Sequence, residues 1–426
     1  MTHVLSLASG ATLLISSQLL AGQLLPVSAR ALSVAAPLAL LASNSFARWT
    51  ASGLETPLFA ALVTFALVAS TGSRIGWACT FCVLATLTRP EGALVAGLVL
   101  ASSWVRSVVE ERPRKARRLL AISLPGLAFA GYLAAHTLFR LHYYEDIVPN
   151  TFHAKVGGIP FQQGLWYVRA FLVDGGALLL PAALASVLLV GRARLASALV
   201  LVVVLYTIGV GGDVFKLGRF LLPGLPALIA LAIAGSHRVF RGSRILGLSL
   251  GLTVPGFALW SLYAFWPTTH EFIGVSREFS LVSGKRTSAR DHEGFSNEVM
   301  MATERIRSIE PPVELLATIG IGRVGYYLPE VAILDLVGLT DRHIAKSPNR
   351  VEGALLLPGH HRTDADYVLD RRPDAIALPR SGAAILFPCV LELKRNPRLD
   401  REYFWDERLQ VYRRRSAALP EDPSRG

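Results

Sequence analysis

The stretch RWTASGLETPLFAALV, residues 48–63, places a short charged and polar connection in front of an almost wholly apolar run. Apolar runs of similar character recur through the first 266 residues and stop there. An α-helix needs about 20 such residues to cross a bilayer. The pattern therefore predicts a mostly α-helical, polytopic membrane protein, in which the polar segment at 48–56 connects two spans.

Composition supports a membrane protein. The chain has 426 residues, of which 52% are hydrophobic and 17% are charged. Soluble domains carry about 25% charged residues. We expect about ten spans, several of them short enough to be partly re-entrant, near residues 4–25, 31–47, 56–70, 74–88, 92–105, 118–139, 176–190, 195–210, 220–236 and 245–266.

The charge distribution predicts the orientation of the spans. Residues 1–266 contain 20 Lys and Arg against 8 Asp and Glu, whereas residues 267–426 contain 23 of each. A basic excess confined to the apolar half is typical of cytoplasmic loops and argues against a nucleic-acid partner. The basic stretches 105–118, 191–194 and 237–244 should face the cytoplasm. The opposite side then holds 48–56, 88–92, 140–175, 211–219 and everything after 267.

The C-terminal part, residues 267–415, is predicted to be a soluble, extracytoplasmic α/β domain. VELLATIGIG (313–322), VAILDLVGL (331–339), AIALP (375–379) and AILFPCVLEL (384–393) are strand candidates, because they are short, apolar and β-branched. The polar end of the chain, residues 416–426, is expected to be a disordered tail.

No metal site or cofactor is predicted. Cys79 and Cys82 form a CxxC inside an apolar run, where small residues at a helix contact explain them. His153 has no second ligand at a suitable spacing. Asp341 and His343, with the nearby His360, His361 and Asp364, suggest acid–base chemistry or a loop held by local hydrogen bonds, and we favour the loop.

Six of the eight acidic residues of the apolar half are expected on one face of the membrane. They are Glu55, Glu91, Glu145, Asp146, Asp174 and Asp213, and the basic residues Arg89, Lys155, Lys216 and Arg219 are expected on the same face. Charges this close to hydrocarbon usually line a polar cavity. Arginine beside carboxylates in such a cavity suits an anionic ligand, above all a phosphate.

The loop RLHYYEDIVPNTFHAKVGG, residues 140–158, combines aromatic, acidic and amide side chains. This mixture is common where proteins bind sugars, since Tyr143 and Tyr144 offer stacking faces and Asn150 offers a hydroxyl partner. An interfacial aromatic belt explains either tyrosine equally well.

Six motifs in one order resemble a known family: SGLETPLFAAL (52–62), LTRPEGAL (87–94), YYEDIVPNTFHAKVGG (143–158), GGDVFKLGRFLLPGLP (211–226), ATIGIGRVGYY (317–327) and LDLVGLTDRHIA (334–345). The order is similar to that of membrane glycosyltransferases of the GT-C fold that use polyprenyl-phosphate sugars. The most similar group contains the terminal β-(1→2)-arabinofuranosyltransferase. The resemblance covers residues from about 30 to about 370.

The resemblance implies an enzyme of a bacterial inner membrane that builds the cell envelope. It would transfer a sugar from a polyprenyl phosphate to an extracytoplasmic glycan or lipid acceptor. The phosphate of the polyprenyl carrier would contact Arg89, Lys155 and Arg219, and also Lys216. The sugar or the acceptor would contact Tyr143, Tyr144, Asn150, Asp213 and Glu91.

The chain departs from the family at its start. The family has a first span followed by a long loop with the catalytic Asp, and this sequence begins at what corresponds to the second span. Either the start codon is misassigned, or the gene is truncated, or the base comes from elsewhere. In the last case the candidates are Asp146, which we favour, Glu55, Asp213 and Glu145. Glu55 can also serve as a charge beside the start of a helix at Pro57.

Two other functions remain open. A degenerate member of the family would act as a membrane scaffold or regulator without catalysis. A transporter of lipid-linked sugars is disfavoured, because transporters commonly place charges near mid-span between paired halves.

Overall fold

The computed structural model describes residues 2–111, 116–155, 161–189, 193–213, 217–265, 303–349, 361–378 and 387–415. The chain divides into two compact units. The first is helical, and the second contains the sheet together with α8 (Asn150–Lys155), which lies between α7 and α9 in the sequence. The expected tail at 416–426 and the side chains of Lys155 and Lys216 lie outside the described residues.

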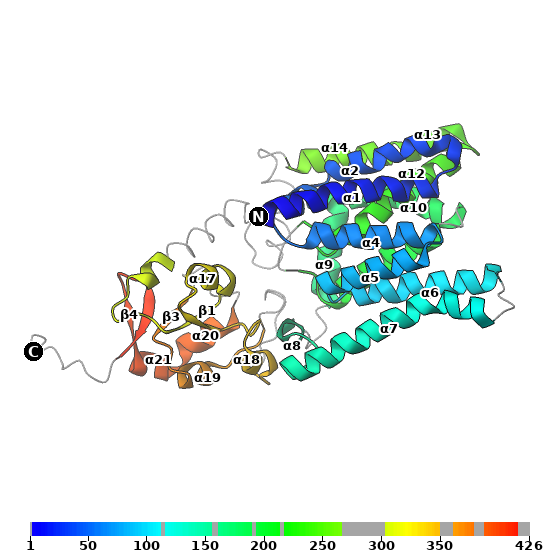
Figure 1. Ribbon diagram of the computed structural model, residues 1–426. Coiled ribbons are helices and arrows are strands. Elements are labelled where there is room, and N and C mark those ends of the chain that lie inside the picture. The colour runs from blue at the N-terminus through cyan, green and yellow to red at the C-terminus, as the bar shows by residue number, and fades with distance from the viewer. Residues whose placement is uncertain are drawn as a thin grey trace, which may run out of the picture. The chain divides into compact units, whose positions relative to one another are not determined.

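The helical unit is built around α12 (Leu225–Phe240), in which every residue from Leu225 to Ser236 is buried. Pro226 suits the first turn of this helix because it has no N–H to leave unbonded. Around α12 lie α1 (Thr2–Leu24), α2 (Ala35–Leu41), α10 (Ala177–Leu189) and α11 (Ala193–Gly209). Figure 1 shows α1, α4 (Thr56–Thr71), α5 (Ile75–Thr88), α6 (Gly92–Glu111) and α7 (Ala116–Tyr144) along one side of this unit.

Several of these helices can cross a membrane. In the part of the chain described, four helical segments are long and apolar enough: Thr2–Leu24, Phe161–Ser186, Leu222–Phe240 and Arg244–Tyr263. A fifth is possible if the bent pair Val27–Leu41 and Asn44–Ala51 is one span. The mostly helical fold with several apolar helices of spanning length is confirmed, but the number of ten spans is not. The runs at 56–70, 74–88 and 195–210 form helices of only 14 to 17 residues.

Two expected segments differ in detail. The span expected at 31–47 is broken: η1 (Val27–Val34) and α2 are followed by α3 (Asn44–Ala51) after a bend of 65°. The outer connection expected over 140–175 includes α9 (Phe161–Phe171) and a π-helical turn, η2 (Leu172–Gly176), which continue into α10 as one apolar segment. The charges of Arg169 and Asp174 concealed the first part of this segment in the sequence.

The second unit contains a five-stranded mixed sheet in the order β2-β1-β3-β5-β4. The strands β1 (Leu315–Thr318), β2 (Ala332–Asp335) and β3 (Ala375–Ala377) are parallel, with Leu316 paired to Ile333 and to Ala375. The strands β4 (Tyr403–Asp406) and β5 (Val411–Arg414) form an antiparallel hairpin that joins β3. The same unit contains α17 (Ile321–Tyr327), α18 (Arg342–Lys346), α19 (Ala365–Asp370), α20 (Pro388–Arg395) and α21 (Pro397–Glu402). Of these helices, α17 contacts β2 and α21 contacts β4.

Three of the four strand candidates coincide with β1, β2 and β3. The fourth, at 384–393, is wrong where the structure describes it, because Pro388 begins the helix α20. A proline at the first helical position is preorganised for the helix and cannot donate to a sheet ladder. The remaining strands, β4 and β5, were not expected, since their charged residues conceal the alternation.

Candidate functional site

Five of the predicted site residues come together in the helical unit. We call Glu55, Arg89, Glu91, Asp213 and Arg219 the charged cluster. They lie in the connections between apolar helices: Glu55 precedes α4, Arg89 follows α5, Glu91 precedes α6, and the other two lie between α11 and α12. The starts of α4, α6 and α12 therefore meet the ends of α5 and α11.

Glu55 links the two arginines of the charged cluster. Its Oε1 accepts a hydrogen bond from Arg89 Nη1 at 2.9 Å and another from Arg219 Nη2 at 2.8 Å. Glu55 is the N-cap residue of α4, but its side chain makes no capping hydrogen bond. The carboxylate therefore binds the two arginines and does not cap the helix.

Each arginine also has a carboxylate of its own. Arg89 Nε donates to Glu91 Oε1, and Arg219 Nη1 donates to Asp213 Oδ2 at 3.3 Å. Arg219 Nε donates in addition to the Thr56 hydroxyl at 3.0 Å. With three carboxylates for two guanidinium groups, the charged cluster has no excess positive charge of its own.

Aromatic rings cover the guanidinium groups. The Arg89 guanidinium carbon lies 5.1 Å from the ring centroid of Phe220 and 5.7 Å from that of Phe59. The Arg219 guanidinium carbon lies 5.6 Å from the ring of Trp49 on α3. Such contacts favour a cation and reduce its access to water. The rings fix the orientation of both arginines.

Solvent reaches the charged cluster mainly at Glu55. Its side chain is 37% exposed, whereas those of Arg89 and Arg219 are 11% and 14% exposed and that of Asp213 is 3% exposed. Burial raises the pKa of Glu55, but its backbone hydrogen bond and the charges of Arg219 and Arg89 outweigh burial and hold the pKa below the usual 4.5. Glu55 is therefore ionised at neutral pH and is a weak proton acceptor.

The lowered pKa predicts how stability depends on pH. A carboxylate with a depressed folded-state pKa stabilises the protein above its unfolded pKa, about 4.5, and this contribution is lost as the pH falls through the folded value. We expect Glu55→Gln to lower the thermal midpoint by a few degrees at pH 7, and the difference to shrink below pH 4.5. Unfolding curves in detergent from pH 7 to pH 3 measure it, and a pH-independent difference contradicts it.

The loop before Arg219 is shaped by its backbone. Gly212 and Gly218 have φ values of +76° and +62°, which glycine adopts without strain. The Leu217 carbonyl accepts a hydrogen bond from Trp49 Nε1 at 3.0 Å. This bond fixes α3 against the loop and places the Trp49 ring beside Arg219.

The remaining predicted residues lie elsewhere. Tyr143 and Tyr144 end α7 and are 68% and 53% exposed. The half-buried Asp146 follows in a turn, in which Arg140 Nε donates to the Ile147 carbonyl at 2.8 Å. The ion pairs described above do not involve these residues.

Asn150 belongs to the second unit. It begins α8, and its Nδ2 donates to the Thr340 carbonyl at 3.2 Å. Arg362 Nε donates to the His153 carbonyl at 3.1 Å, so that α8 is held beside α18. Lys155 is the last residue of α8.

The acidic and histidine motifs of the second unit form local contacts. Asp341 and Asp364 cap α18 and α19 through their side chains. His343 Nε2 lies 2.8 Å from Asp364 Oδ2, and the His343 ring stacks on Tyr367, whose hydroxyl donates to Asp341. These are the contacts of a hydrogen-bonded loop. His360 lies outside the described residues.

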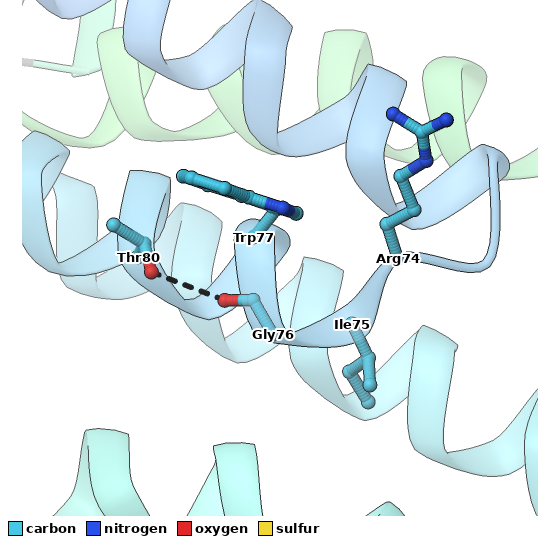
Figure 2. Close-up of a pocket in the computed structure, with 5 residues that line it drawn as sticks. All are labelled: Arg74, Ile75, Gly76, Trp77 and Thr80. Carbon is cyan, nitrogen blue, oxygen red and sulfur yellow. Dashed lines mark hydrogen bonds between the residues drawn. The ribbon is translucent and has the colours of Figure 1, made fainter.

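A hollow on the surface of the helical unit lies away from the charged cluster. It is lined by Arg74, Ile75, Gly76, Trp77 and Thr80, at the opposite end of α5 from Arg89. Figure 2 shows Arg74 and Trp77 projecting to the same side while Ile75 points away. No group of three or more metal-ligating side chains occurs among the residues that the structure describes.

The fold combines a helical unit, in which several apolar helices are long enough to cross a membrane, with a second unit built on a mixed sheet. A family model described as "Domain of unknown function (DUF8728)" matches residues 293–415, which contain this sheet. No curated protein and no solved structure matches the chain.

Proposed function

We propose that the protein is a membrane glycosyltransferase that moves a sugar from a polyprenyl-phosphate donor to an extracytoplasmic glycan or lipid. The observation that carries the proposal is the charged cluster, in which five charged side chains from three connections meet at one end of apolar helices. Keeping such groups near hydrocarbon is costly without a ligand or a partner. The order of motifs in the sequence is the reason for proposing that the ligand is a polyprenyl-phosphate sugar.

The reaction assigns different roles to the two candidate bases. The acceptor oxygen bonds to the anomeric carbon, the bond from that carbon to the phosphate oxygen breaks, and polyprenyl phosphate leaves with the electron pair. Arg89 and Arg219 would stabilise the charge on the leaving phosphate. Glu55, with its lowered pKa, would orient both arginines, and Asp146 would accept the proton of the acceptor hydroxyl.

The pairing of both arginines favours one alternative, a non-catalytic scaffold. A buried ion-pair network can fix the arrangement of helices without binding a ligand. In that case the charged cluster stabilises the helical unit, and the protein has no turnover.

A transfer assay tests the proposal. We expect the protein in vesicles to release polyprenyl phosphate from an arabinofuranosyl or mannosyl donor when a glycan acceptor is present, and Asp146→Asn to slow this release about 10²- to 10⁴-fold. The matched control is Asp366→Asn, in the second unit, whose side chain is 72% exposed. Absence of release by folded protein with every donor would favour the scaffold.

A further inference from the structure

Two of the buried polar side chains of α3 lie at the start of the helix. Asn44 and Ser45 are 6% and 5% exposed. Within the residues that the structure describes, neither Asn44 Nδ2 nor Ser45 Oγ has a hydrogen-bond partner. An unsatisfied buried donor costs about 1–3 kcal/mol, so such groups are rare in native proteins and usually meet a water or a ligand.

Ser45 lies on the side of α3 that faces the charged cluster. It is four residues before Trp49, and residues at this spacing share one face of a helix. Trp49 covers the Arg219 guanidinium and donates to the Leu217 carbonyl. Ser45 Oγ is also only 3.7 Å from the position that a Cβ on Gly218 would take.

Three other buried hydroxyl groups of the helical unit show a contrast, although Thr50 Oγ1 and Ser186 Oγ also have no hydrogen-bond partner among the described residues. Ser236, Thr64 and Ser103 each donate to the carbonyl four residues earlier, at 2.8 Å. This bond is the usual solution for a buried hydroxyl in a helix. Ser45 cannot form this hydrogen bond within α3. The helix begins at Asn44, after the bend, so the carbonyl four residues before Ser45 does not belong to it.

We propose that Ser45 and Asn44 form a subsite that binds the hydroxyl groups of a sugar, next to the arginines that bind the phosphate. The inference rests on the proposed function, because it assigns the sugar of the lipid-linked donor to this position. A sugar carries several hydroxyl groups, each of which donates and accepts, so different hydroxyl groups would satisfy Ser45 Oγ and Asn44 Nδ2. The sequence analysis did not identify these residues, because an Asn-Ser pair between apolar runs is typical of a helix start.

The test compares two lipids on the full-length protein in detergent. The probes are polyprenyl phosphate with and without an arabinofuranosyl group, and the readout is the thermal midpoint. In the wild type, the sugar-bearing lipid should raise the midpoint more than the bare lipid. In Ser45→Ala and Asn44→Ala that difference should fall at least by half, while the effect of the bare lipid remains.

The controls separate recognition from folding. Without lipid, Ser45→Ala should unfold within about 2 °C of the wild type, since it removes an unsatisfied group. Ser236→Ala loses a satisfied hydroxyl on α12 and should keep the wild-type difference between the lipids.

The remaining outcomes are also distinct. If Ser45→Ala and Asn44→Ala keep the full difference between the lipids, the subsite is wrong and the proposed function stands. If the wild type responds equally to both lipids, the subsite is again wrong and only the phosphate site stands. If neither lipid changes the midpoint, the proposed function is overturned, and the subsite with it.

Discussion

Arg219→Ala is expected to abolish sugar transfer and to weaken the helical unit. Arg219 contacts Glu55, Asp213 and the Thr56 hydroxyl, and its side chain is 14% exposed. Its removal leaves Asp213, only 3% exposed, without its cation. Breaking a buried ion pair in this way typically destabilises by about 3–5 kcal/mol. Loss of one group that stabilises the transition-state charge slows a reaction about 10²- to 10³-fold.

The measurement combines release of polyprenyl phosphate with thermal unfolding in detergent. Arg219→Lys should keep the charge but lose the geometry, because an ammonium group cannot contact three partners in one plane. Arg74→Ala is the matched control, since Arg74 is exposed and belongs to no ion pair among the described residues. Wild-type release and stability in Arg219→Ala would exclude a role for the charged cluster.

Gly235→Ala is expected to separate α10 from α12 and to lower the yield of folded protein severely. A Cβ on Gly235 would lie 1.9 Å from the Ala182 carbonyl oxygen and 2.8 Å from the Ser186 amide nitrogen. Both atoms belong to the backbone of α10, which cannot rotate away as a side chain does. Close contact through small residues is the usual basis of helix packing in membranes. Overpacking of this kind costs about 3 kcal/mol or more.

The control is the same substitution on α6. Gly97 has no heavy atom within 4 Å of the position of its Cβ, so Gly97→Ala introduces no clash. Since alanine is the better helix former, this variant should gain about 0.5–1 kcal/mol. The fraction of protein that elutes as a single species in detergent and the thermal midpoint measure both variants. Equal values for the two would contradict the packing between α10 and α12.

The charged cluster shows which features of the site can be predicted from the sequence and which cannot. Glu55, Arg89, Glu91, Asp213 and Arg219 were predicted to share one face, because charges next to apolar runs collect at the ends of spans. Glu55 was a candidate for orienting an arginine, but which carboxylate pairs with which arginine was not predictable, since both arginines were expected to bind a phosphate. Pairing depends on which connections meet, and that is set by the packing of α4, α5, α6, α11 and α12.

Asn44 and Ser45 show what the sequence conceals. A polar pair at the start of a helix is ordinary in sequence, and only burial without a hydrogen-bond partner makes it unusual. The helical stretch formed by α9 and η2, before the span expected at 176–190, was missed because Arg169 and Asp174 interrupt the apolar run.

The sequence by itself determined the class of protein, since the length and spacing of apolar runs reflect the thickness of a bilayer. It also indicated the strands β1, β2 and β3, because short apolar runs bounded by turns favour strands, although a similar run at 384–393 forms the helix α20 where the structure describes it. The tertiary structure alone decided that Glu55 bridges two arginines and that α8 belongs to the unit with the sheet. These features depend on contacts between residues far apart in the chain, which local patterns do not encode.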